Sequence, residues 1–143
     1  MRSRLIGWTA AALVMAAASV ASAATLHFTT SLKGGDEVPA NTTTGKGEVT
    51  ASLDTGTKVF TYKVTYSGLT GPATMAHFHG PAAAGANAPP VVPVPASALA
   101  NPMTGTATLT DAQIADLRAG KWYFNIHTAA HPGGEVRGQL KAK

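Results

Sequence analysis

Short segments in which apolar and polar residues alternate recur along most of this chain, and each is followed by residues that favour turns. Alternation with a period of two is typical of β-strands that pack one face on a core. About seven such segments can be distinguished, and they do not alternate with helices, a pattern typical of sandwiches and barrels. The sequence therefore predicts an all-β fold, an antiparallel β-sandwich or barrel of Greek-key type.

A hairpin and a helix are the most clearly predicted elements. Residues 47–54 and 57–69 both alternate and flank a Thr-Gly turn, which predicts a β-hairpin. Further along, Thr110 and Gln113 have the spacing of a capping box, in which each side chain bonds the backbone N–H of the other. This spacing predicts one short helix near residues 111–119.

Residues 81–95 are rich in alanine, glycine and proline, a composition that disfavours a regular helix. We expect a long loop here, with a short extended piece at Val91 and Val92. Long loops in compact domains are often functional, so this loop is a candidate for covering or bordering a site.

The N-terminal residues have the features of a secretory signal peptide. A basic start precedes an apolar stretch, and Ala21-Ser22-Ala23 matches the small-residue motif that precedes cleavage. We expect residues 1–23 to be removed and residues 24–143 to form the mature domain, which is periplasmic or secreted and no longer attached to a membrane. The alternative is an uncleaved anchor helix, because the apolar stretch approaches the roughly 20 residues that span a bilayer.

The chain has no cysteine among its 143 residues, so no disulfide or thiolate site can form. A metal must therefore be bound by nitrogen and oxygen, unless Met75 or Met103 donates a thioether to copper(I) instead of packing in the core. Loss of Arg2 and Arg4 with the signal peptide reduces the 11 basic side chains to 9, against 7 acidic ones. With so little net charge, the mature chain is not expected to bind nucleic acid.

Four of the five histidines form two compact pairs. His77 and His79 are two apart in an alternating segment, so both rings leave the same face of a strand. His127 ends another alternating segment, and His131 follows four residues later, before the turn Pro132-Gly133-Gly134. A chain that folds back at this turn can bring the second pair of rings together.

We expect His77, His79, His127 and His131 to bind one metal ion. A set of neutral imidazoles favours copper among the divalent ions, and zinc is the alternative because of its availability. Calcium and magnesium are poor candidates because neither pair contains a carboxylate. The competing interpretation is a polar sheet face without a metal, since a His-x-His pair is by itself a weak signal.

Three polar residues near the second pair are candidates for orienting its ligands. Asn125 shares the face of His127, although an asparagine that bonds backbone groups is the alternative. Glu135 and Arg137 are two apart, so they could form an ion pair, or Glu135 could orient His131.

Three longer motifs resemble the CHRD domain, which is named after chordin. They are GGDEVPA at residues 34–40, YSGLTGPATMAHFHGPA at residues 66–82 and NIHTAAHPGGEVRGQL at residues 125–140. The resemblance covers nearly the whole mature chain. It implies an exported or extracellular β-sandwich domain, as in animal chordins, where it accompanies growth-factor-binding modules, and in many secreted bacterial proteins.

The order of the motifs is also similar to the copper half of the Cu/Zn superoxide dismutases, so the sandwich is expected to be immunoglobulin-like or superoxide-dismutase-like. The resemblance implies His77, His79 and His127 as copper ligands. It also implies that Arg137 lies near the place of the arginine that guides superoxide. The disulfide and the zinc-binding loop of those enzymes are absent from this sequence, and His131 would be a ligand from a position that they do not use.

These observations predict an exported copper-binding protein that stores copper, transfers it or carries electrons. A closed four-histidine site leaves superoxide little access to the metal, so a dismutase-like enzyme is the less favoured alternative. The other alternative is an interaction module without chemistry, in which loops at one end of the sandwich, including residues 81–95, hold a protein partner.

Overall fold

The computed structural model describes residues 14–19 and 22–143, which contain nine strands and one α-helix. The strands are β1 (Thr25–Lys33), β2 (Lys46–Asp54), β3 (Val59–Ser67), β4 (Ala73–His79), β5 (Pro90–Pro93), β6 (Met103–Thr108), β7 (Tyr123–Thr128), β8 (Val136–Gln139) and β9 (Lys141–Ala142). The helix is α1 (Asp111–Arg118), and two 3-10 turns are η1 (Gly34–Asp36) and η2 (Ala96–Ala98). Most of the expected signal peptide, residues 1–23, lies outside the described residues. Within the described ranges, no helix is both long and apolar enough to cross a membrane.

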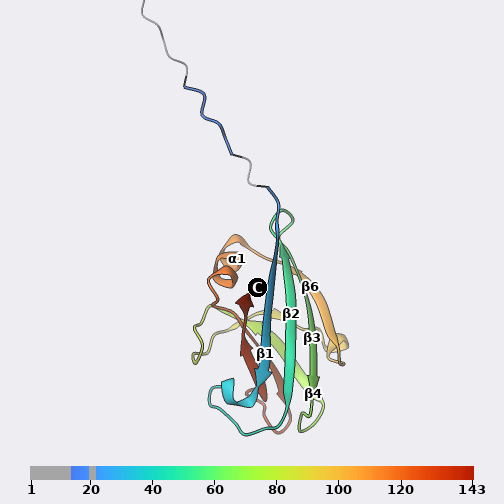
Figure 1. The fold of residues 1–143 in the computed structure, drawn as a ribbon. Helices are drawn as coiled ribbons and strands as arrows, with labels where there is room; N and C mark the ends of the chain where they lie inside the picture. The colour runs from blue at the N-terminus through green and yellow to red at the C-terminus, as the bar shows by residue number, and fades with distance from the viewer. Residues whose placement is uncertain (1–13, 20–21) are drawn as a thin grey trace, which may run out of the picture.

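The strands form one antiparallel sheet in the order β5-β4-β7-β8-β1-β2-β3-β6. Its two halves face each other, with β1, β2, β3 and β6 in one layer and β4, β5, β7 and β8 in the other (Figure 1). The layers join where β1 pairs with β8 at Lys33 and Arg137, and β9 also pairs with β1. The sheet is therefore nearly closed, like a barrel, and the predicted all-β fold is confirmed.

Aromatic side chains from both layers fill the space between them. Phe60 of β3 lies edge-on to Phe78 of β4 with ring centroids 5.1 Å apart, and Trp122 lies 5.6 Å from Phe60. Phe124 of β7 is 4.6 Å from Phe78. All four side chains are fully buried, and each such burial contributes roughly 1.5–3 kcal/mol. This packing holds β4 and β7 side by side with their other face turned away from the core.

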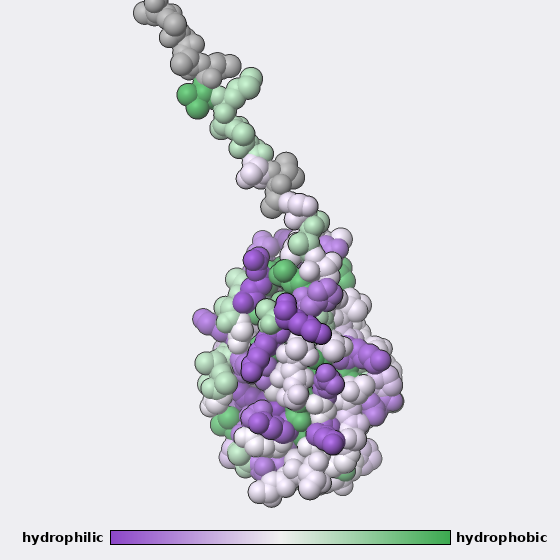
Figure 2. Space-filling view, in the orientation of Figure 1, coloured by the Kyte–Doolittle hydropathy of each residue, from purple (hydrophilic) through white to green (hydrophobic). Residues whose placement is uncertain are grey.

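The outer face of the layer formed by β1, β2, β3 and β6 is mainly hydrophilic or near neutral (Figure 2). Threonine, serine and lysine alternate with core residues along these strands, as is usual where one sheet face meets water. His27 is exposed on β1, opposite Ser52 of β2.

The predicted hairpin, helix and loop are all present. β2 and β3 pair along their length. Thr110 caps α1, and both hydrogen bonds of the capping box with Gln113 are formed. The segment after β4 is irregular apart from β5, which contains Val91 and Val92.

β7 is buried on both faces. Phe124 and Ile126 face the core, as the alternation predicts. Asn125 and His127 point to the other side, yet they are only 3% and 8% exposed. The loop between β4 and β5 and the turn after β7 both fold against this outer face and bond its side chains. The long loop therefore borders the predicted histidine site.

Candidate metal centre

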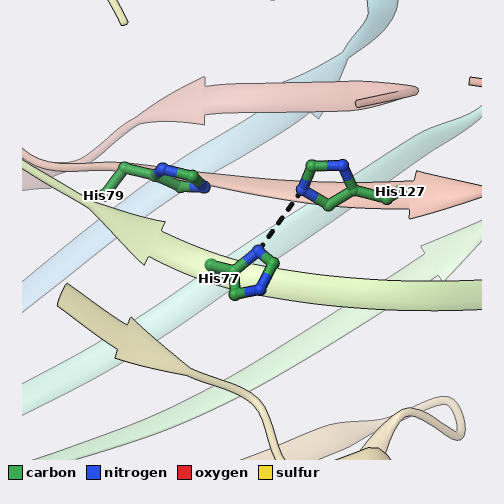
Figure 3. Close-up of side chains that lie close together, drawn as sticks. All are labelled: His77, His79 and His127. Atoms are coloured by element: carbon green, nitrogen blue, oxygen red, sulfur yellow. Dashed lines mark hydrogen bonds between the residues drawn. The ribbon is translucent and has the colours of Figure 1, made fainter. Parts of the chain in front are cut away.

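Three histidine side chains meet on the outer face of β4 and β7. His77 and His79 come from β4 and His127 comes from β7 (Figure 3). One nitrogen from each ring lies within 4.8 Å of the other two, and His77 Nδ1 is 3.3 Å from His127 Nε2. The structure thus brings together three of the four predicted ligands.

The register of β4 and β7 explains why these rings meet. His77 pairs with Asn125, and His79 pairs with Tyr123. His127 is two residues beyond Asn125 on the same face, which makes it a diagonal neighbour of His77. Diagonal neighbours in antiparallel pairs are about 7–8 Å apart, within reach of long side chains. The apolar residues between them pack on the core and fix this register.

Backbone carbonyls contact two of the three rings, and one of them, His127, is held in a single tautomer. His79 Nδ1 lies 2.9 Å from the carbonyl oxygen of Ala88, and His127 Nδ1 lies 2.9 Å from that of Pro132. A carbonyl oxygen can only accept, so His127 Nδ1 carries the proton and the neutral His127 ring keeps a lone pair on Nε2. Histidines that bind metals are typically oriented in this way by a hydrogen bond from the other nitrogen. His79 differs because its Nε2 also faces an acceptor, Asn125 Oδ1, which competes with the Ala88 carbonyl for the single proton of the neutral ring.

The spacing of two of the ring nitrogens suits a shared ion. Zinc–imidazole bonds are about 2.0–2.1 Å long, and two such bonds at a tetrahedral angle place their nitrogens about 3.4 Å apart. His77 Nδ1 and His127 Nε2 are 3.3 Å apart. An ion can therefore bind both rings with little movement of either side chain.

Burial favours the neutral form of His77 and His79, which is the form that a metal requires. The pKa of His77 is lowered below its ordinary value by burial and then by the neighbouring rings of His127 and His79. Burial also lowers the pKa of His79, although its hydrogen bonds with Ala88 and Asn125 offset part of this effect. At neutral pH both rings have a lone pair for a metal ion.

Asn125 lies between His79 and a buried acid that the sequence did not single out. Asn125 Oδ1 lies 2.9 Å from His79 Nε2, the nitrogen that faces the site, and can only accept a hydrogen bond from it. On its other side, the Asn125 amide nitrogen lies beside the carboxyl of Glu37, which is 5% exposed. Burial raises the pKa of Glu37 to about 7, against smaller lowering effects of Arg137 and Asn125. A metal ion at Nε2 would have to displace the Asn125 oxygen and the proton that this oxygen favours there.

Tyr123 and Arg137 form a stack beside the histidines. The Tyr123 ring is parallel to that of His79, with centroids 4.6 Å apart, and the Arg137 guanidinium carbon lies 3.5 Å from the Tyr123 centroid. Because β7 lies between β4 and β8, the tyrosine separates the arginine from the histidine. Arg137 also donates to Asn87 Oδ1 and to the carbonyl oxygen of Ala86, and it is only 2% exposed. The guanidinium is therefore a buried support of the site.

The sequence profile of the CHRD domain matches residues 28–140, a range that includes all three clustered histidines. The chain belongs to the CHRD domain family. Comparisons with curated proteins and with solved structures gave no match. The resemblance carried by the three long motifs is thus confirmed, and the similarity to the copper half of superoxide dismutases stays a prediction.

Glu135 supports the CHRD domain away from the histidine rings. Its carboxylate accepts hydrogen bonds from the hydroxyls of Thr43, Thr70 and Thr128 and from the backbone N–H of Thr70. Burial raises the pKa of Glu135, but these four hydrogen bonds outweigh burial and leave the pKa below its ordinary value. The structure does not pair Glu135 with Arg137. Glu135 instead anchors Thr128, the residue after His127.

His131 is not part of the group of three ring nitrogens. Its backbone closes the turn after β7, where its N–H donates to the carbonyl oxygen of Thr128 and its own carbonyl oxygen accepts from Gly134. This turn places the Pro132 carbonyl against His127 Nδ1. A ring contribution of His131 to the site stays a prediction.

Gly134 lies against Glu37, the buried acid that the sequence analysis did not identify. Its φ is +129°, and a side chain here would collide with Glu37 Oε1 and with Asn125 Nδ2. The glycine therefore lets the HPGGEV segment pass directly over the contact between Glu37 and Asn125. The sequence signals were two glycine-rich motifs, each containing an acid, but nothing in either motif indicated that they meet.

Proposed function

We propose that this CHRD domain is a copper-binding module with His77 Nδ1, His79 Nε2 and His127 Nε2 as ligands. The observation that supports this most strongly is the convergence of three ring nitrogens within 4.8 Å. The His127 ring is also fixed by the Pro132 carbonyl so that its Nε2 faces His77.

The donor set favours copper over other common ions. Imidazole nitrogen suits copper and zinc, and copper binds more tightly in the general order of divalent-metal affinities. No carboxylate belongs to the group among the described residues, which disfavours calcium and magnesium. Zinc remains the second choice.

Export of the protein is part of the proposal and rests on the signal-peptide features of residues 1–23 and on the family. In the periplasm or outside the cell, a site of this kind serves to store copper, to pass it on or to carry electrons. We expect superoxide dismutation to be weak, because Arg137 is buried under Asn87 and Tyr123 and cannot draw in an anion.

Electron paramagnetic resonance of the copper(II)-loaded protein tests the ligand set. The wild type should give a type 2 spectrum with nitrogen hyperfine structure, and His77→Ala and His127→Ala should each lose it. His27→Ala is the matched control, because His27 is exposed on β1 in the other layer, and it should leave the spectrum unchanged. Loss of the spectrum in His131→Ala would instead support the four-histidine set, and an unchanged spectrum in His77→Ala would contradict the proposal.

An interaction module is the second candidate, favoured by the exposure of residues 83–87 in the loop between β4 and β5. A metal that binds only the folded state raises the melting temperature by mass action. If copper and zinc leave the melting temperature unchanged while a defined partner protects this loop from protease, the interaction function is the correct one.

A further inference from the structure

Met75 is the only large hydrophobic side chain exposed in residues 22–143, at 48% exposure. Met103, by contrast, is fully buried in the core on β6. An isolated exposed hydrophobic residue is common on protein surfaces. The exposure of Met75 is of interest because this residue lies beside the histidines.

Met75 lies on the histidine face of β4. It alternates with His77 and His79 along the strand, so all three side chains point to the same side. In the pairing with β7, Met75 is directly opposite His127. The register shifts between Ala73 and Met75, and irregularities of this kind often redirect a side chain beside a functional site.

The thioether of Met75 is within reach of a metal held by the histidines. Directly opposite residues in an antiparallel pair have Cβ atoms about 4.5–5.5 Å apart, and methionine has a long, flexible side chain. Met75 is therefore a near neighbour of His127 at the edge of the group. Sulfur ligands of this soft kind select copper(I) among the ions available to an imidazole site.

We propose that Met75 Sδ is a further ligand of this site and that it binds copper(I). The inference rests on the proposed copper site and extends it to a three-nitrogen, one-sulfur donor set for the reduced ion. His79 and His127 are each only 8% exposed, whereas His77 is half-buried and Met75 is exposed. Copper(I) thus enters and leaves on the side of Met75 and His77, which suits a protein that hands copper to another protein.

Competition with a copper(I) chelator such as bicinchoninate, under anaerobic conditions, tests the assignment. Met75→Leu preserves the size and apolar character of a half-exposed side chain. It should weaken copper(I) binding at least tenfold and change copper(II) and zinc(II) binding by less than about threefold, because only the soft ion depends on sulfur. Met103→Leu is the matched control and should leave all three affinities unchanged.

X-ray absorption of the copper(I)-loaded protein provides an independent measurement. The wild type and Met103→Leu should show a sulfur neighbour of copper, and Met75→Leu should show only nitrogen or oxygen neighbours. If Met75→Leu binds copper(I) as tightly as the wild type, or if the wild type shows no sulfur neighbour, the role of Met75 is refuted while the histidine site stands. If the wild type binds neither copper(I) nor copper(II), both proposals are wrong.

Discussion

Replacing Glu37 with glutamine should stabilise the domain at neutral and alkaline pH. The Glu37 carboxyl is only 5% exposed, and its Oε1 has no hydrogen-bond partner. Burial raises its pKa from 4.5 to about 7, although the Arg137 guanidinium and the Asn125 amide favour the ionised form. Glutamine has the shape of the protonated acid and cannot ionise, so it avoids the cost of a buried charge.

The size of this effect follows from proton linkage. A carboxyl whose pKa is raised by folding stabilises the fold fully below its unfolded pKa of 4.5, and this contribution is lost as the pH rises through about 7. At about 1.4 kcal/mol per pH unit, the interval from 4.5 to about 7 corresponds to about 3 kcal/mol. Between pH 4.5 and pH 8, the free energy of unfolding of Glu37→Gln should therefore rise relative to the wild type by up to about 3 kcal/mol.

Urea denaturation of the metal-free protein across this pH range measures the difference. Unfolding can be followed by the fluorescence of Trp122, which is fully buried and is the only tryptophan in residues 24–143. Glu48→Gln is the control, because Glu48 is exposed on β2, and its stability curve should run parallel to that of the wild type. A Glu37→Gln curve that also runs parallel to the wild type would refute the assignment of a raised pKa to Glu37.

Three further predictions concern the site and the fold. Tyr123→Phe keeps the stack on His79 but loses the hydrogen bonds of the hydroxyl with Ala88. A copper titration should show about tenfold weaker binding, the smallest loss usual for residues that orient metal ligands without binding the metal. Copper binding should persist as the pH falls through 6.5, because the pKa values of His77 and His79 lie below that ordinary value, and a binding curve that collapses at 6.5 would contradict this. Thr110→Ala removes the cap of α1 and should lower the free energy of unfolding by about 1 kcal/mol in urea without changing copper affinity.

The faces of the site strands could be predicted from the sequence because alternation is a local property. The spacing of His77 and His79 predicted that they share a face, and the pattern around Phe124 predicted that His127 points away from the core. The capping box at Thr110 is equally local and is confirmed. Each of these features depends on residues within one element.

The partners of the charged residues could not be predicted in this way. Glu37 lies in a turn motif of a kind that is usually exposed, and its burial depends on contact with Gly134 almost a hundred positions later. Glu135 and Arg137 are close in sequence, but threonines satisfy the first and Tyr123, with the loop after β4, satisfies the second. Such contacts are set by how the layers pack, which a single sequence does not display.

Equilibrium dialysis against copper(II), followed by metal analysis of the protein, tests the central claim most directly. The mature wild-type domain should retain a single equivalent of copper, and His77→Ala combined with His127→Ala should retain none, while His27→Ala should match the wild type. A wild-type domain that retains no copper, or a double variant that retains a full equivalent, would show that the three histidines are a polar face of the sheet and not a metal centre.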